Sequence, residues 1–229
     1  MGQLGELVPV TRRSTPEIIA DELRSAIMYG QFTPGDQLGE ADLAARLGVS
    51  RGPLREAMQR LVQEGLLRSE PHRGLFVIEL DESDVQDVYL ARLAIERQAC
   101  QLVMAEHRAE AAVALTQSLA DLVRAAEKHD RLAMSDADQA FHQALVHASG
   151  SPRLERMANT LLVETRMCLN ALQAKYPEPK DLVDEHRALL QAIKTGDEAK
   201  LLRLIEEHMT DSINRLRPPQ PEPPTAEAS

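Results

Sequence analysis

The spacing of apolar residues changes near residue 80, and this change predicts two folded parts. Between residues 15 and 64, apolar side chains recur three and four positions apart in three short runs, which indicates three helices separated by turns. Short β runs follow at 66–69 and 75–78, joined by the turn-rich tip EPHRG. From about residue 82 to residue 216 every segment has helical periodicity, which indicates an all-helical second part.

Capping and turn residues set the expected boundaries in the first part. Thr15 is expected to cap the first helix, with Pro16 at the first helical position, where its missing N–H costs nothing. Gly48 lies between a second helix at about 40–47 and a third at about 51–64, and glycine accepts the left-handed conformation of a sharp turn. Helix, turn, helix and β-hairpin in this order predict a winged helix-turn-helix.

The second part is expected to be an antiparallel helical bundle, because short links join its helices. The helices are predicted at about 82–106, 109–129, 131–149, 151–174, 179–195 and 197–216. The whole chain is therefore expected to be mainly α, with a small β-hairpin wing in its first domain. The expected parts are a flexible arm at 1–14, the winged helix-turn-helix at 15–79, the all-α bundle at 82–216 and a disordered proline-rich tail at 217–229.

Composition and charge add to this picture. Aromatic residues make up 3% of the chain and tryptophan is absent, which favours helix-on-helix packing. The net charge of −10 argues against a protein coated in nucleic acid along its length. Within residues 46–73, however, six arginines face three glutamates, a net charge of +3. A local basic patch on an acidic protein is typical of a protein that touches DNA with one face only.

The two cysteines and the ends of the chain suggest no further chemistry. Cys100 and Cys168 match no metal or redox spacing, and buried helix positions are expected for both. No signal peptide, membrane-spanning run or lipidation signal is present, so a cytoplasmic protein without a membrane partner is the default expectation.

The start of the third predicted helix carries the candidate DNA-reading residues, Ser50, Arg51, Gly52 and Arg55. A recognition helix usually presents its N-terminal residues to the major groove, where arginine can bind guanine O6 and N7 with both arms of its guanidinium. Gly52 would let the backbone approach DNA closely. Arg46, on the preceding helix, is better placed for a phosphate.

The wing tip supplies a second set of candidates. His72, Arg73 and Gly74 could reach the minor groove or the DNA backbone. The alternative is that the arginines of this region are ordinary surface residues, but the ordered set of turn, cap, arginines and wing favours DNA binding. Arg60 and Arg68 are instead expected to be surface residues or intramolecular partners.

At this point the sequence resembles a known family. The run LGEADLAARLGVSRGPLREAMQRLVQEGLL, followed by PHRGLFV, is similar to the DNA-binding domain of the GntR family of bacterial transcription regulators. The resemblance covers about residues 12–79 and implies DNA contacts at Ser50, Arg51, Gly52, Arg55 and the wing-tip glycine region. Ala41 departs from the pattern, since some members have an arginine there, and this puts the outer bases of an operator in doubt.

The second part holds a candidate metal site. Asp138 and His142 are four positions apart and share one helix face, while His186 and His208 lie on two later helices that could be antiparallel neighbours. One carboxylate and three imidazoles are the ligands expected for a divalent ion such as Zn, Ni, Co or Mn. Spacing alone leaves the alternative of structural histidines open.

Residues 82–216 resemble the all-helical, ligand-binding FCD domain of the FadR-type GntR subgroup. The matching runs are ARLAIERQAC, DQAFHQALVHASGSPRL and EHRALLQAIKTGD followed by EEHM. In many members the positions matching the four candidate ligands bind a metal in the bundle core, so the resemblance implies a metal here. His107, His129 and His147 fall outside the pattern, and Asp136 is the carboxylate most easily mistaken for a ligand.

Three further residues are candidates for effector binding. The resemblance implies that Arg92 faces the cavity and holds a carboxylate, although a salt bridge to Glu96 one turn later is an equal alternative. Arg166 and Asn170 share a face of one helix and could line the same cavity.

The resulting hypothesis is a ligand-responsive transcription regulator that binds a short palindromic operator as a homodimer, with a small carboxylate effector at the metal site. Repression is the expected mode. Two alternatives remain at this stage: a metal-sensing regulator, and a metal-dependent hydrolase that uses the four ligands, for which no separate general base is evident.

Overall fold

The computed structural model describes the backbone of residues 13–173 and 178–216, and the side chains of 13–167 and 178–215. The predicted tail at 217–229, and all of the predicted arm except Arg13 and Ser14, lie outside the described residues. The chain divides into two compact units between Glu79 and Leu80. No described helix combines the length and the apolar character needed to cross a bilayer.

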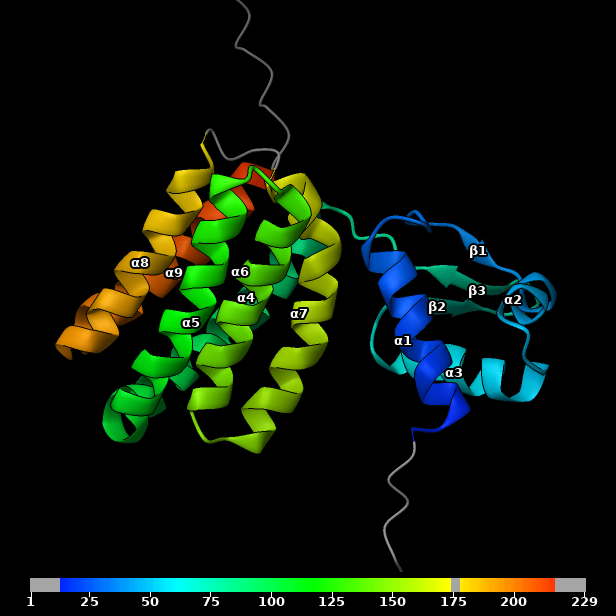
Figure 1. The fold of residues 1–229 in the computed structure, drawn as a ribbon, viewed down its shortest axis with the longest axis horizontal. Coiled ribbons are helices and arrows are strands. Elements are labelled where there is room, and N and C mark those ends of the chain that lie inside the picture. The colour runs from blue at the N-terminus through cyan, green and yellow to red at the C-terminus, as the bar shows by residue number, and fades with distance from the viewer. Residues whose placement is uncertain (1–12, 174–177, 217–229) are drawn as a thin grey trace, which may run out of the picture. The chain divides into compact units, whose positions relative to one another are not determined.

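The first unit is a helix-turn-helix with a small sheet (Figure 1). Its elements are α1 Thr15–Met28, β1 Gln37–Leu38, α2 Glu40–Leu47, α3 Arg51–Gln63, β2 Leu67–Glu70 and β3 Gly74–Val77. β3 lies between β1 and β2, and both pairings are antiparallel. The sequence did not predict β1, because a strand of two residues is too short to show an alternating pattern.

The start of α1 differs from the prediction by one residue. Ser14, not Thr15, is the N-cap: its side chain accepts from the Glu17 backbone N–H, and the Glu17 carboxylate accepts from the Ser14 N–H at 2.9 Å. This reciprocal pair is a capping box, which satisfies two backbone donors that the helix leaves unpaired. Thr15 therefore occupies the first helical position and Pro16 the second.

The core of the first unit comes from α1 and α3, which pack together. Leu23 on α1, and Leu54, Met58 and Leu61 on α3, are almost completely buried. Gly48 has the positive φ of 64° that the turn between α2 and α3 requires. The core thus holds α3 by one face and leaves the opposite face exposed.

The second unit is a bundle of helices that lie side by side (Figure 1). Its elements are α4 Glu82–Leu102, η1 Val103–His107, α5 Arg108–Glu127, α6 Arg131–Ala148, α7 Pro152–Gln173, α8 Pro179–Thr195 and α9 Glu198–Leu216. α4 packs against α7 and α9, and α5 packs against α6 and α8. The predicted fold class, a winged helix-turn-helix followed by an all-helical bundle, is confirmed.

The predicted break near residue 107 is a π-helical turn, η1. Neither glycine nor proline occurs at 103–108; α4 continues directly into η1, and the non-helical backbone of His107, with φ −128° and ψ 21°, marks the start of α5. The other links follow the predicted signals, and Gly196 ends α8 with a positive φ of 77°.

A core substitution tests the packing of the first unit. Leu61→Ala should destabilise this unit by about 2–5 kcal/mol, because Leu61 is fully buried and its truncation leaves a cavity. Leu47→Ala, at a leucine that is 36% exposed, is the matched control and should cost much less. Hydrogen exchange of the α1 and α3 amides measures both effects; equal losses of protection would contradict the described core.

Candidate metal centre and DNA-contacting surface

Four metal-ligand side chains meet in the core of the helical unit. Asp138 and His142 lie one turn apart on α6, His186 lies on α8 and His208 on α9. One ligand atom from each lies within 4.8 Å of the other three, and all four residues are buried. The structure therefore brings together all the residues that were predicted to bind a metal.

A carboxylate orients the ring of His142. The Nδ1–H of His142 donates to Oε2 of Glu96 at 2.6 Å, and Arg92 Nε donates to the other oxygen of Glu96 at 3.0 Å. A carboxylate can only accept, so the proton of the neutral imidazole lies on Nδ1. Nε2 of His142 is thereby left as a lone-pair donor that faces the cluster.

The other two histidines are oriented in the same way. Nδ1 of His186 lies 2.8 Å from the backbone oxygen of Leu182, and Nδ1 of His208 lies 2.9 Å from Oε2 of Glu185. Arg215 donates to the second oxygen of Glu185 at 2.8 Å. An acceptor at Nδ1 that fixes the ring and frees Nε2 is typical of metal-binding histidines.

The free nitrogens of the cluster face one another. Nε2 of His142 and Nε2 of His208 are 3.1 Å apart. Nε2 of His186 lies 3.2 Å from Oδ1 of Asp138, yet it has no hydrogen-bond partner within the described part of the chain. Lone pairs and a carboxylate at these separations repel one another in a buried site, and a cation among them would remove the repulsion. The residues present therefore fit a divalent metal ion.

Burial and the charges around the cluster keep Asp138 ionised and His142 neutral, the forms that a metal requires. Burial raises the pKa of Glu96, but attraction to His142 and Arg92 outweighs burial and lowers this pKa to about 2. Burial lowers the pKa of His142 to about 4, although Glu96 opposes the shift. Burial raises the pKa of Asp138 and lowers that of His186, but the close contact between the two side chains outweighs burial, lowering the pKa of Asp138 and raising that of His186. A metal would thus meet an ionised carboxylate and a neutral His142, and its binding would compete with a proton at His186.

The structure describes the side chains of two of the three predicted effector residues. Arg92 is buried and pairs with Glu96, as the alternative interpretation of this residue proposed: its Nη2 lies 2.9 Å from Oε1 of Glu96. Arg166 is also buried and donates to Asp136 at 2.7 Å. Asp136 is half-exposed and lies outside the cluster, as expected. The side chain of Asn170 lies outside the described residues.

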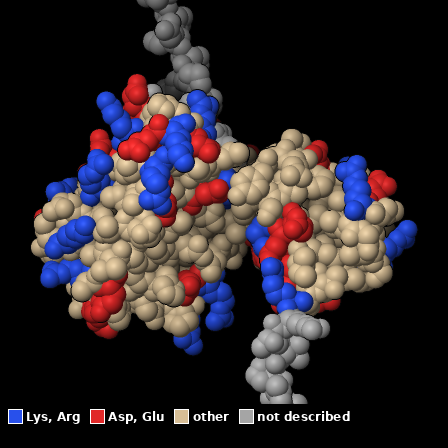
Figure 2. All heavy atoms as spheres, in the orientation of Figure 1, with Lys and Arg blue, Asp and Glu red and all other residues tan. Residues whose placement is uncertain are grey.

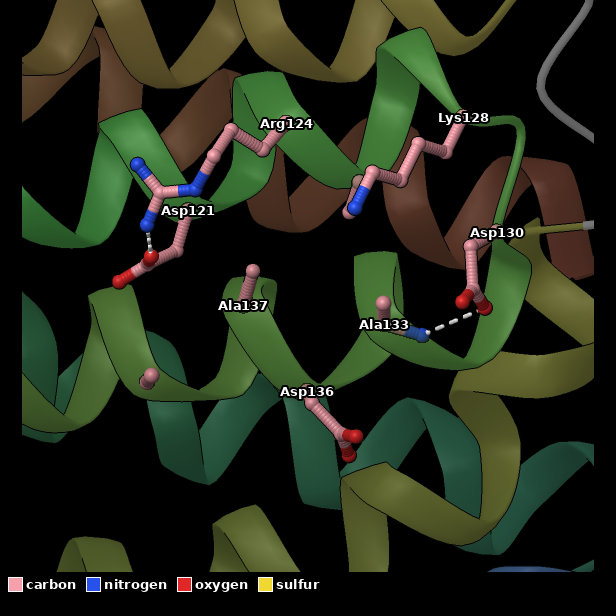
Figure 3. A pocket seen from close by; sticks show the side chains of 9 residues that line it. Asp121, Arg124, Lys128, Asp130, Ala133, Asp136 and Ala137 are labelled. Carbon is pink, nitrogen blue, oxygen red and sulfur yellow. Dashed lines mark hydrogen bonds and ion pairs between the residues drawn. The ribbon is translucent and has the colours of Figure 1, made fainter.

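A surface groove of about 410 Å³ lies between α5 and α6 (Figure 3). Arg124 and Lys128 extend from α5, Asp136 extends from α6, and Asp130 caps α6 through the Ala133 N–H. None of the four cluster residues lines this groove, so it is separate from the candidate metal centre.

Ser50, Arg51 and Gly52, at the start of α3, are exposed, and the fold does not use the side chains of Ser50 and Arg51. Arg51 forms no hydrogen bond or ion pair with a described residue, and Ser50 occupies the N-cap position without a side-chain capping bond. A Cβ added to Gly52 would meet no atom within 4 Å, and its φ is not in the left-handed region. Neither packing nor backbone conformation therefore requires glycine at this position.

The two flanking arginines differ from each other. Arg46, in the last turn of α2, is exposed and has no partner among the described residues. Arg55 donates from Nε to the Glu40 carboxylate at 2.7 Å. Glu40 therefore orients Arg55 through Nε, whereas no described residue holds Arg46 or Arg51.

The wing tip is a tight turn with exposed side chains. His72 and Gly74 both have positive φ, 64° and 107°. Arg73 pairs with Glu70 on β2, and its guanidinium lies 5.1 Å from the centre of the Phe76 ring. Figure 2 shows that charged side chains on the visible face of the molecule are scattered among uncharged ones.

Sequence reasoning missed the two carboxylates that orient the histidines. Glu96 was considered only as a partner of Arg92, and Glu185 was not considered at all. Glu96 lies 46 positions from His142, and Glu185 lies 23 positions from His208, so no local spacing links them. The only available signal is that Glu185 directly precedes His186 in the run DEH.

Two family models match the chain. The FCD domain matches residues 87–211, and the model of bacterial regulatory proteins of the gntR family matches residues 15–77. An HTH-type transcriptional regulator from an unstable DNA locus of Streptomyces ambofaciens is 31% identical over 206 residues, which cover 88% of this chain and 86% of that protein.

Two further proteins are similar to this chain over most of their length. The gluconate operon transcriptional repressor of Bacillus licheniformis is 29% identical over 207 residues, covering 88% of this chain and 85% of the repressor. A crystal structure of a GntR transcriptional regulator from Rhodococcus sp. RHA1 has a TM-score of 0.78 and 26% identity, covering 89% of this chain and 98% of that one. The chain therefore belongs to the GntR family of bacterial transcription regulators, with an FCD domain as its second unit, and is not an enzyme.

Proposed function

We propose that this regulator is a repressor that binds a short inverted repeat as a homodimer, and that a small carboxylate effector changes its affinity for DNA. The effector would bind at a divalent ion held by Asp138, His142, His186 and His208. One observation carries the proposal: three imidazoles, each with an acceptor at Nδ1, and one carboxylate meet in a buried cluster whose ligand atoms all lie within 4.8 Å of one another. The similarity to a gluconate operon repressor supports both repression and an organic acid as the effector class.

The buried polar groups near the cluster support a carboxylate effector. A bound Zn, Ni, Co or Mn ion would supply a positively charged anchor with coordination positions left open by the four protein ligands. Arg92 is a buried cation paired with Glu96, and Ser135, one turn before Asp138 on α6, has a buried hydroxyl without a hydrogen-bond partner among the described residues. Both groups can donate to a carboxylate oxygen, and an unsatisfied buried donor costs free energy until it finds an acceptor.

The DNA-binding role is proposed for the exposed face of the first unit. Arg51 would take a guanine through both arms of its guanidinium, with Ser50 beside it and the Gly52 backbone close to the DNA. Arg46 is placed for a phosphate, and Arg55, which Glu40 orients, would join it. The wing tip at His72, Arg73 and Gly74 would contact the DNA backbone or the minor groove.

A metal-sensing regulator is the second candidate, because His142 and His186 are fully buried and an ion alone could order this core. Its DNA affinity would follow the concentration of free metal ion. In the proposed function, metal-loaded protein binds DNA and releases it only when a small carboxylate is added. Titrating metal and a panel of sugar acids and hydroxy acids separately against a DNA complex distinguishes the two.

His142→Ala should abolish metal binding, because it removes one of four ligands. Elemental analysis of the purified, dialysed protein should find about one metal ion per chain in the parent and little in this variant. His147→Ala is the matched control, since His147 lies on the same helix but is exposed and pairs with Glu155. Equal metal content in all three proteins would exclude the proposed site.

Glu96→Gln should weaken metal binding by roughly 10–100-fold, because an amide orients the His142 ring less strongly than a carboxylate does. Glu155→Gln removes the same kind of contact from the exposed His147 and should leave metal affinity unchanged. Competition with a chromogenic chelator measures both affinities. An unchanged affinity for Glu96→Gln would show that the Glu96 contact does not support the ligand.

Two substitutions test the DNA-contacting face, with DNA selected from a random-sequence pool by the parent protein as the probe. Arg51→Ala should weaken binding by roughly 1–3 kcal/mol and relax base preference at one position of each half-site. Gly52→Ala should weaken binding by about 1–3 kcal/mol through a clash with DNA.

Gly52→Ala should nevertheless leave the melting temperature equal or higher, since a Cβ there meets nothing in the chain and alanine favours helix. Arg60→Ala, near the other end of α3, is the control for both variants. Parent-like binding by Arg51→Ala and Gly52→Ala would place the recognition surface elsewhere.

A further inference from the structure

The surface groove between α5 and α6, here called the α5–α6 groove, has the size of a small-molecule site (Figure 3). Ala125 of α5 and Ala133, Ala137 and Ala140 of α6 line it, and their side chains end at Cβ where larger ones would fill the space between the helices. Its volume of about 410 Å³ lies within the range of about 300–1,000 Å³ that ligand pockets occupy. A protein partner needs a much larger surface, so the groove suits a small molecule.

The fold already engages the carboxylates that α6 contributes to the groove. The side chain of Asp136 points away from α5 and accepts a hydrogen bond from Arg166 of α7 at 2.7 Å (Figure 3). Asp130 is the N-cap of α6, and its carboxylate accepts from the Ala133 N–H at 3.1 Å. Both anions thus have partners that the protein itself supplies.

The two cations of the groove are less fully engaged. Lys128 is exposed, extends from α5 toward the space between the helices, and forms no hydrogen bond or ion pair with a described residue (Figure 3). Arg124 donates to Asp121 on its own helix through Nη2 alone, so Nε and Nη1 make no hydrogen bond within the described chain. Lys128 follows Arg124 by four positions, so the two like charges share one face of α5 and repel each other. An anion bound between them would remove this repulsion.

We propose that the α5–α6 groove binds a small organic dianion, a dicarboxylate or a phosphate ester, through Arg124 and Lys128. Each cation donates charge-assisted hydrogen bonds to one anionic group, and these are stronger than bonds between neutral groups. Four helical positions correspond to about 6 Å along α5, so two anionic groups on a short carbon chain can meet both cations. The carbon chain lies over the alanine side chains, which present only methyl groups.

The α5–α6 groove is a second ligand site and goes beyond the proposed function. Ala133 and Ala137 line the groove, whereas Asp138 and His142, on the same helix, belong to the candidate metal centre. A carboxylate added to the protein could therefore bind at either place. The test must report on the groove itself and must separate it from the metal centre.

Alanine-methyl NMR spectra of the full-length protein locate the bound dianion directly. Succinate and glycerol 3-phosphate are the probes, and the preferred one identifies the anionic group as carboxylate or phosphate. In the parent protein, the methyl signals of Ala125 and Ala133 should shift saturably. The double variant Arg124→Gln/Lys128→Gln keeps polar side chains but removes both charges, and should raise the dissociation constant roughly 10-fold or more.

Two further variants serve as controls. Arg131→Gln removes an exposed cation near the start of α6 that does not line the groove, and should bind the probe as the parent does. His142→Ala removes a candidate metal ligand and should leave the shifts of Ala125 and Ala133 in place. Circular dichroism verifies that each variant is folded.

Saturable shifts that the double variant loses and both controls keep support the groove as a dianion site. Shifts that persist in the double variant, or that His142→Ala abolishes, would overturn it, and so would the absence of a shift with either probe at millimolar concentration. Shifts caused by an oligoglutamate peptide, but by neither probe, would overturn the small-molecule occupant and indicate an acidic peptide. None of these results depends on whether the protein binds DNA as a metal-loaded repressor.

Discussion

Three imidazole rings buried in a helix bundle need a partner for each ring nitrogen, and this requirement organises the second unit. Acceptors from two helices serve the Nδ1 atoms: Glu96 of α4 for His142, and Leu182 and Glu185 of α8 for His186 and His208. Among the described residues no separate donor reaches the Nε2 atoms, since those of His142 and His208 lie 3.1 Å apart and that of His186 lies 3.2 Å from Oδ1 of Asp138. A buried polar atom left unsatisfied costs about 1–3 kcal/mol, and the proposed metal ion would remove this cost.

The contacts behind the cluster connect it to the rest of the bundle. Glu96 ties His142 on α6 to Arg92 on α4, and Glu185 ties His208 on α9 to Arg215 near the end of the same helix. α4 thus carries Arg92 and Glu96 on its buried side and Leu90 on its exposed side. One helix therefore supplies both members of the ion pair that orients His142.

The arginines of the first unit differ in whether they contact another residue of the same unit. Arg24 of α1 is held by Glu64 at the end of α3 and serves the fold. Arg46 and Arg51 are exposed and make no such contact within the described chain. The side chains of α3 that pack in the core lie on one face of the helix. The side chains that make no contact within the fold lie at its N-terminal end, which is the end that would meet a DNA groove.

The sequence by itself determined the elements and the part of the site that depends on one element. Apolar period, glycine and proline placed α2 and α8 at their observed bounds, and the spacing of four puts Asp138 and His142 on one face of α6 because helix geometry is local. Only the tertiary structure decided that His186 and His208 reach that face and that Glu96, not Asp136, supports it. It also decided that Gln37 and Leu38 form a strand against β3. These features depend on how distant segments pack, and local periodicity contains no information about which distant segment a side chain will meet.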